Sequence, residues 1–190
     1  MKRTPEPADF ESAYLACATE VASAYRRDGE IAPVIYGVTL ADQPGTFRSV
    51  SPIPPRIAAL IFSHPVLKDH LVPFVRMLLE DGSELREVMP LFGLARPDLV
   101  MVATEGWILG ADLDRDADPR EELRKYGGEV RNHPDAQAAI LVQVHALGKT
   151  RIGFCPVDAA SRTVIIGDLS PDDGKLSGRM SITDNEDTPE

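Results

Sequence analysis

The chain has 190 residues, of which 43% are hydrophobic and 26% are charged, as in an ordinary soluble globular protein. These values exclude a wholly disordered chain, a collagen-like repeat and a disulfide-stapled miniprotein. The formal net charge of −10 argues against broad nucleic-acid binding, because the phosphates would be repelled.

Two helices are predicted in the N-terminal half. Apolar residues recur at helical spacing from Phe10 to Ala24, and Gly29 is suited to the helix end, so we expect a helix over residues 5–27. A second apolar stripe predicts a helix over residues 56–81. Both helices would pack on one central sheet.

Short apolar runs bounded by turn residues predict about five strands. The proline-rich residues 41–55 predict a loop, with at most a short extended piece at 46–50. The run at 99–109 is apolar at both parities in its first half, which is typical of a strand covered on both faces. We therefore expect an α+β fold with a single mixed or antiparallel sheet. Its predicted strands are residues 32–40, 99–109, 139–147, 150–157 and 162–167.

The last three strands read as a meander. Gly148-Lys149 is suited to a two-residue hairpin loop of type II′, which would place His145 opposite Ile152. One face of the hairpin would then carry Leu141, Gln143 and His145, and the other Ile140, Val142 and Val144. We expect the helices to cover the main face, and loops or a partner to cover part of the second face.

The negative charge is concentrated in two segments. Residues 112–122 and residues 170–190 each carry a net charge of −4, which leaves −2 for the rest of the chain. Such segments are usually solvated. We therefore expect residues 1–169 to form one globular domain and residues 170–190 to form a disordered acidic tail.

The sequence also indicates a compartment. Cys17 and Cys155 are far apart and belong to no Cys-x-x-Cys pair, which predicts two reduced thiols rather than a zinc or redox motif. No apolar run follows Met1-Lys2-Arg3, and no stretch approaches ~18 uninterrupted apolar residues. We expect a cytoplasmic protein without a cofactor and without contact to membranes or nucleic acid.

Acidic side chains occupy every second position from Asp112 to Asp118. A calcium loop needs oxygens at its positions one, three and five, glycine at six and glutamate at twelve. Asp112, Asp114 and Asp116 fill the first three positions, whereas alanine and leucine stand at six and twelve. We expect a solvated loop, with a divalent cation held by these three carboxylates as the alternative.

The most unusual chemistry follows the buried strand. Glu105 and Trp107, the only tryptophan, stand near its end, and His133 and Asp135 precede the strand at 139–147. If the two strands pair, all four side chains would line one rim as a ligand or acid–base site. The structural alternative is a hydrogen-bonded clasp between loops.

These residues also carry a family resemblance. Thr104-Glu105-Gly106-Trp107 and Asn132-His133-Pro134-Asp135 resemble the Ser-Glu-Ala-Trp-like strand end and the Glu-His-Pro-Asp-Arg-like turn of a group of small bacterial and phage proteins. The resemblance covers about residues 99–147 and implies a shared site or clasp, but no reaction. The departures from the group are Gly106 in place of alanine, Asn132 in place of glutamate and Ala136 in place of arginine.

The chain contains no complete catalytic motif of the nucleophile-elbow, phosphate-loop or dinucleotide-binding type. We therefore expect a non-catalytic binding or regulatory module that acts through a protein partner and self-associates. One alternative is a small hydrolase that uses Glu105, His133 and Asp135. The other is a protein that responds to divalent cations through residues 112–118.

Overall fold

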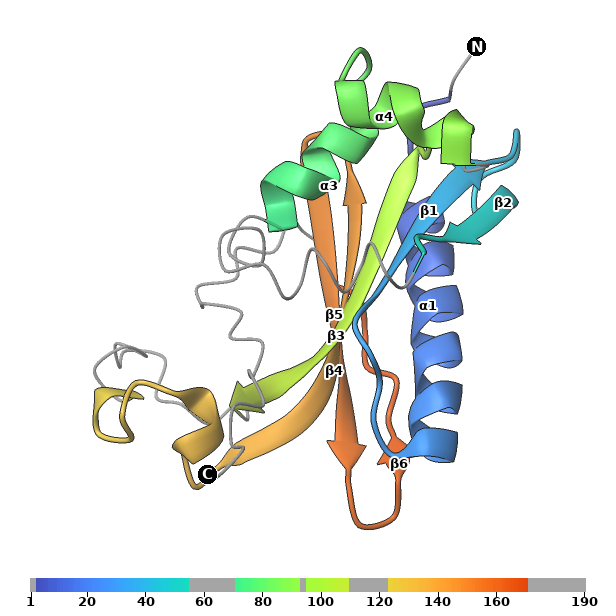
Figure 1. The fold of residues 1–190 in the computed structure, drawn as a ribbon. Coiled ribbons are helices and arrows are strands. Elements are labelled where there is room, and N and C mark those ends of the chain that lie inside the picture. The colour runs from blue at the N-terminus through green and yellow to red at the C-terminus, as the bar shows by residue number, and fades with distance from the viewer. Residues whose placement is uncertain (1–2, 55–70, 93–94, 110–122, 171–190) are drawn as a thin grey trace.

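Six antiparallel strands form the sheet of the computed structural model, which describes residues 3–54, 71–92, 95–109 and 123–170 (Figure 1). The predicted α+β class and antiparallel sheet are confirmed, but the predicted number of strands is wrong by one. The order across the sheet is β2-β1-β3-β4-β5-β6. The strands are β1 (Val34–Leu40), β2 (Phe47–Pro52), β3 (Leu99–Leu109), β4 (Ala136–Ala146), β5 (Lys149–Asp158) and β6 (Thr163–Val164).

The helices lie on opposite faces of the sheet, not on one main face as predicted. Helix α1 (Pro7–Asp28) runs along one face (Figure 1), where Met101 and Ala103 of β3 join its core cluster. Val100 and Val102 point the other way and pack with Val75 and Leu78. Successive side chains of β3 point to opposite faces of the sheet, so this strand contributes to a hydrophobic core on each face, as its apolar pattern predicts. The second layer contains α3 (Leu71–Leu79), α4 (Glu84–Val88) and the 3-10 turn η2 (Met89–Phe92), and the rest of the predicted helix over 56–81 lies outside the described residues.

Helix α1 begins two residues later than predicted, because Glu6 is its N-cap. The buried Asp9 side chain accepts hydrogen bonds from the Glu6 backbone N–H (2.7 Å) and from the Gly45 backbone N–H (2.7 Å). Arg3 binds both Asp9 oxygens at 2.6 and 2.7 Å, and these bonds lower the pKa of Asp9 against the opposing effect of burial. Asp9 thus joins the helix start to the β1–β2 turn. No helix in the described part of the chain has the length and apolar character needed to cross a membrane.

Strand β2 lies within the predicted loop and overlaps the short extended piece predicted at 46–50, which it extends to residue 52. Its partners run from Tyr36–Pro52 to Leu40–Phe47, with an irregularity after Thr39. β2 is an edge strand, and prolines are tolerated at the ends of edge strands because no ladder hydrogen bond is lost there. The proline content of residues 41–55 therefore obscured the strand.

The β4–β5 hairpin has the predicted faces but a different register. Its loop is Leu147-Gly148, so His145 pairs with Thr150 and Gln143 pairs with Ile152. Gly148 has a φ of 75°, which puts the positive φ at the second loop position, whereas a type II′ turn needs it at the first. The pairing shifts by two residues, and an even shift leaves each side chain on its predicted face.

The last predicted strand, residues 162–167, shrinks to the two residues of β6. Arg162 has a φ of 53°, outside the extended region, which delays the strand. After β6 the chain follows β5 through isolated contacts, including the Ile165 N–H to Pro156 O bond at 3.0 Å. A Cβ on Gly167 would lie 2.4 Å from the Phe154 carbonyl oxygen, which shows how closely the two segments approach.

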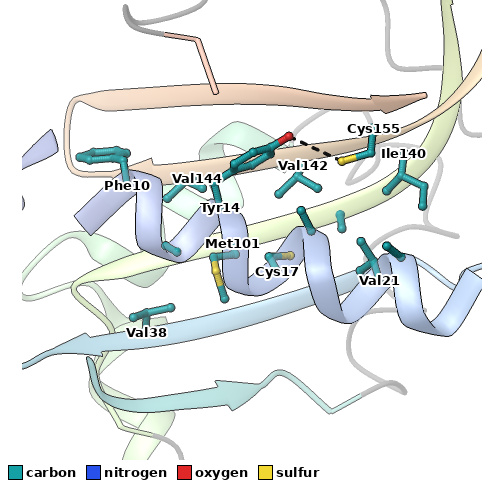
Figure 2. Close-up of a cluster of buried hydrophobic side chains, with 14 of the residues drawn as sticks. Phe10, Tyr14, Cys17, Val21, Val38, Met101, Ile140, Val142, Val144 and Cys155 are labelled. Carbon is teal, nitrogen blue, oxygen red and sulfur yellow. Dashed lines mark hydrogen bonds between the residues drawn. The ribbon is translucent and has the colours of Figure 1, made fainter. Parts of the chain in front are cut away.

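The α1 core contains a large ring packed on a glycine. Tyr14 is 2% exposed, and its hydroxyl donates to the Gly167 carbonyl at 2.7 Å. The hydroxyl also lies 3.6 Å from the Cys155 sulfur (Figure 2). A Cβ on Gly153 would meet the Tyr14 ring at 2.2 Å. The missing side chain of Gly153 therefore makes the space that the ring occupies.

Candidate functional site

A small cavity lies where α1 ends and the strands continue. Gly29 adopts a φ of 84° and ends the helix, and the chain then passes Glu105 of β3 on its way to β1. Trp107 pairs with Ala138 in the β3–β4 ladder, and both residues border the hollow. The resulting hollow has a volume of about 90 Å³. We call it the corner cavity, and it is lined by Tyr25, Glu105, Gly106, Trp107, Ala138, Ala139 and Val157.

Glu105 is the carboxylate of the corner cavity. Its Oε1 atom accepts a hydrogen bond of 2.6 Å from the Ile31 backbone N–H, in the segment between α1 and β1. Glu105 follows Met101 and Ala103 in alternation, so it faces the side of the sheet that α1 covers. This bond fixes the carboxylate, although the residue as a whole is exposed.

Two aromatic residues flank Glu105. Trp107 lies on the same side of β3 and is 45% exposed, whereas Tyr25 of α1 is buried. Burial raises the pKa of Tyr25, and the negative charge of Glu105 raises it further. The phenol therefore stays protonated and can donate or accept a hydrogen bond.

The other charged groups near Tyr25 are already engaged. Arg162 donates to the Arg27 carbonyl at 3.2 Å and so neutralises the C-terminal end of α1. Asp158 accepts hydrogen bonds from the Ala160 N–H and from the Ser161 hydroxyl, and these bonds lower its pKa. Neither group depends on Glu105.

The structure brings Glu105 and Trp107 together, but it does not place His133 and Asp135 in the corner cavity. His133 is buried, and its Nδ1 accepts a hydrogen bond from the Asp135 backbone N–H at 3.1 Å. Its ring also meets Tyr126 at a centroid distance of 4.6 Å. The two residues belong to a turn that is closed by a bond within the turn itself, and the described contacts of these two residues do not include Glu105.

This separation follows from the strand ends. The β3–β4 ladder continues to the pair Leu109–Ala136, so β4 begins three residues before the predicted 139. Glu105 lies four residues before Leu109, or about 13 Å along the strand at ~3.3 Å per residue. Because the β3–β4 ladder is longer than predicted, the turn of His133 and Asp135 lies beyond its end and not beside Glu105.

The metal-binding alternative concerns Asp112, Asp114 and Asp116, which lie outside the described residues. Within the part of the chain that the structure does describe, no three His, Cys, Asp or Glu side chains gather in a metal-binding group.

Gly106 offers a direct check on the geometry of the cavity. Because Glu105 and Trp107 face the cavity, a side chain at position 106 would point to the opposite face, where no described atom lies within 4 Å of the added Cβ. Gly106→Ala is expected to raise the free energy of unfolding by about 0.5–1 kcal/mol, because it restricts the unfolded chain. Urea denaturation measures the change, and a loss of stability would show that position 106 packs closely against another part of the chain.

Comparison with known proteins finds no matching family model, no matching curated protein and no matching solved structure. The resemblance to the bacterial and phage group therefore stays a prediction. The corner cavity remains as the feature of the described chain from which a function can be inferred.

Proposed function

We propose that this chain is a non-catalytic binding module that receives a side chain of a protein partner in the corner cavity. The observation that carries the proposal is the half-exposed Trp107 beside the fixed carboxylate of Glu105. Tryptophan is enriched at binding hot spots, because its ring offers a large contact area at a small cost in side-chain entropy.

The volume of the cavity favours a side chain over a whole metabolite. About 90 Å³ is well below the ~300–1,000 Å³ of common small-molecule sites. A few buried atoms at ~1.5 kcal/mol each give an affinity on the order of millimolar. A physiological partner would add contacts around the rim.

The hydrolase alternative has less support. General acid–base chemistry needs a second group within hydrogen-bond reach of the reacting atoms. His133 and Asp135, the predicted partners of Glu105, are not among the residues that line the cavity. Tyr25 lines it, but its raised pKa keeps the phenol protonated, so it cannot take up a proton as a general base.

Trp107 supplies both the test and its signal, because it is the only tryptophan. A panel of single amino acids, each capped as the Nα-acetyl N′-methylamide, is titrated while fluorescence of the indole is followed. We expect at least one chemical class of side chain to give a saturable change. In Trp107→Leu the same ligand should bind about tenfold more weakly, as read from the amide NMR signal of Ala138, since the aromatic wall is lost.

Met77 provides the matched control, because it is also 45% exposed but belongs to α3 on the opposite face. Met77→Ala should bind the ligand as the unmodified chain does. If no member of the panel gives a saturable response, or if both variants weaken binding equally, the corner cavity is not a binding site. The predicted self-association remains a separate prediction.

A further inference from the structure

We infer that the corner cavity accepts an alkylammonium group, namely the end of a lysine side chain. This inference rests on the proposed function and specifies its ligand. It follows from the bonding of Glu105, from the charges around the cavity, and from the aromatic walls.

Glu105 has unused acceptor capacity. A carboxylate has about four lone-pair sites, and the described contacts of Glu105 comprise one hydrogen bond, from Ile31. No Lys, Arg or His of the described chain forms an ion pair with Glu105. A carboxylate that lines a partly apolar hollow gains most from a ligand that is both a cation and a hydrogen-bond donor.

The surrounding charges favour a cation. Asp158 and Glu105 both raise the pKa of Tyr25, so their fields reach this corner of the molecule. Arg162 opposes them at Tyr25, but its guanidinium donates to the Arg27 carbonyl at the end of α1 and does not line the cavity, where Glu105 is the charged side chain. An anion would approach two carboxylates, whereas an ammonium group would be attracted by them.

The aromatic walls suit the same ligand. A cation over the face of tryptophan, or of tyrosine, is attracted by the negative face of the ring. Trp107 and Tyr25 both line the cavity, and Val157 and Ala138 provide apolar contact for the methylene groups of a lysine stem. The carboxylate and the aromatic rings therefore suit the ammonium group of a lysine, and the apolar residues suit its methylene stem.

Lysine fits better than arginine. A guanidinium group binds a carboxylate best through both oxygens at once. Here the Ile31 N–H already uses one lone pair of Oε1 at 2.6 Å and fixes the orientation of the carboxylate, which restricts the approach of a two-pronged donor. An ammonium group is a compact charge that needs a single oxygen, and its few atoms match a cavity of about 90 Å³.

The test compares capped lysine with capped norleucine, which has the same stem without the ammonium group. We expect lysine to bind about tenfold more tightly by Trp107 fluorescence, because the cation supplies the ion pair and the contact with the ring. Glu105→Gln should weaken lysine binding about tenfold and leave norleucine binding unchanged. The glutamine carbonyl can still accept the Ile31 N–H, so the thermal midpoint of Glu105→Gln should stay close to that of the unmodified chain.

Glu30 gives the control variant, since it is an exposed carboxylate next to Ile31 and its removal changes the net charge equally. Glu30→Gln should bind lysine normally. Butylamine identifies the source of the ammonium group: a lysine-containing peptide should bind more tightly than butylamine if the group comes from a protein partner, and equal or tighter binding of butylamine would overturn that source.

The result that overturns the inference is specific. If norleucine, or a carboxylate side chain, binds as well as lysine and still depends on Trp107, the cavity binds side chains but is not selective for ammonium, and the proposed function survives. Equal weakening by Glu105→Gln and Glu30→Gln would show a general charge effect and would also overturn it. If no capped amino acid binds at all, both proposals are wrong.

Discussion

Replacing Gly153 with alanine is expected to lower the free energy of unfolding by about 3 kcal/mol, one of the largest effects of any single methyl group in the described chain. The added Cβ would lie 2.2–2.7 Å from three atoms of the Tyr14 side chain. Tyr14 cannot move without loss, because it is 2% exposed and its hydroxyl donates to the Gly167 carbonyl. The clash therefore displaces α1 or breaks that hydrogen bond.

A double-mutant cycle with Tyr14→Leu separates this clash from other effects. Leucine lacks the outer ring atoms that the new Cβ would meet, so Gly153→Ala should cost less than about 1 kcal/mol in that background. Urea denaturation of the four proteins gives the coupling energy. Additive costs would show that the Tyr14 ring is not the obstacle, and Gly106→Ala serves as a comparison for the same substitution in a strand with open space.

The alternation of apolar residues along the strands predicted the central part of the sheet correctly. The run at 99–109 is apolar at both parities at its start, and β3 buries Met101 against one helical layer and Val102 against the other. The assignment of hairpin faces is confirmed because face depends only on parity. Parity does not determine the register of the hairpin. The loop is Leu147-Gly148, with the positive φ at its second residue, so the register differs from the predicted one by two residues.

Features that depend on contacts distant in sequence were not predictable. β2 was anticipated only as a short extended piece at 46–50, because the pairing with β1 that stabilises it as a strand is not visible in its own residues. The distribution of helices over two faces likewise depends on the chain path between them. An amphipathic stripe shows that a helix has a buried side, but not which face of the sheet receives it.

In the candidate site, too, local sequence features were predictable and distant contacts were not. Glu105 and Trp107 were found because a carboxylate and a large ring directly after an apolar strand need a special environment. Tyr25 was missed, since the predicted apolar stripe of this helix ended at Ala24, whereas α1 buries Tyr25. His133 and Asp135 were grouped with Glu105 because β4 was expected to begin at 139, and the three additional residues of ladder moved their turn away.

Acidification is expected to destabilise the protein well before its carboxylates are protonated, because His145 is buried on the face of the sheet that α1 does not cover. Its side chain is 3% exposed, and its Nε2 has no hydrogen-bond partner among the described residues. Nδ1 lies 2.9 Å from the Thr150 hydroxyl, which satisfies one of the two ring nitrogens. Burial lowers the pKa of His145 to about 4 from an unfolded value of 6.5.

The sign of the pH dependence follows from linkage. Between pH 6.5 and pH 4 the unfolded chain binds a proton that the folded chain does not, so the free energy of unfolding falls as the pH falls. The stability is complete above pH 6.5, and the shift predicts a loss of about 2 kcal/mol between pH 7 and pH 5 and of about 3 kcal/mol by pH 4. Urea denaturation at half-unit intervals of pH measures this slope.

His145→Asn is expected to abolish most of the slope between pH 7 and pH 5, because the amide can still hydrogen-bond to Thr150 but does not titrate. Val144→Ala is the control: it removes two methyl groups from the α1 core, lowers stability at every pH and should keep the slope. If His145→Asn keeps the slope as well, the acid sensitivity belongs to another group. An NMR titration of the imidazole then decides the point directly, since a pKa near 6.5 in the folded protein would show that water reaches Nε2.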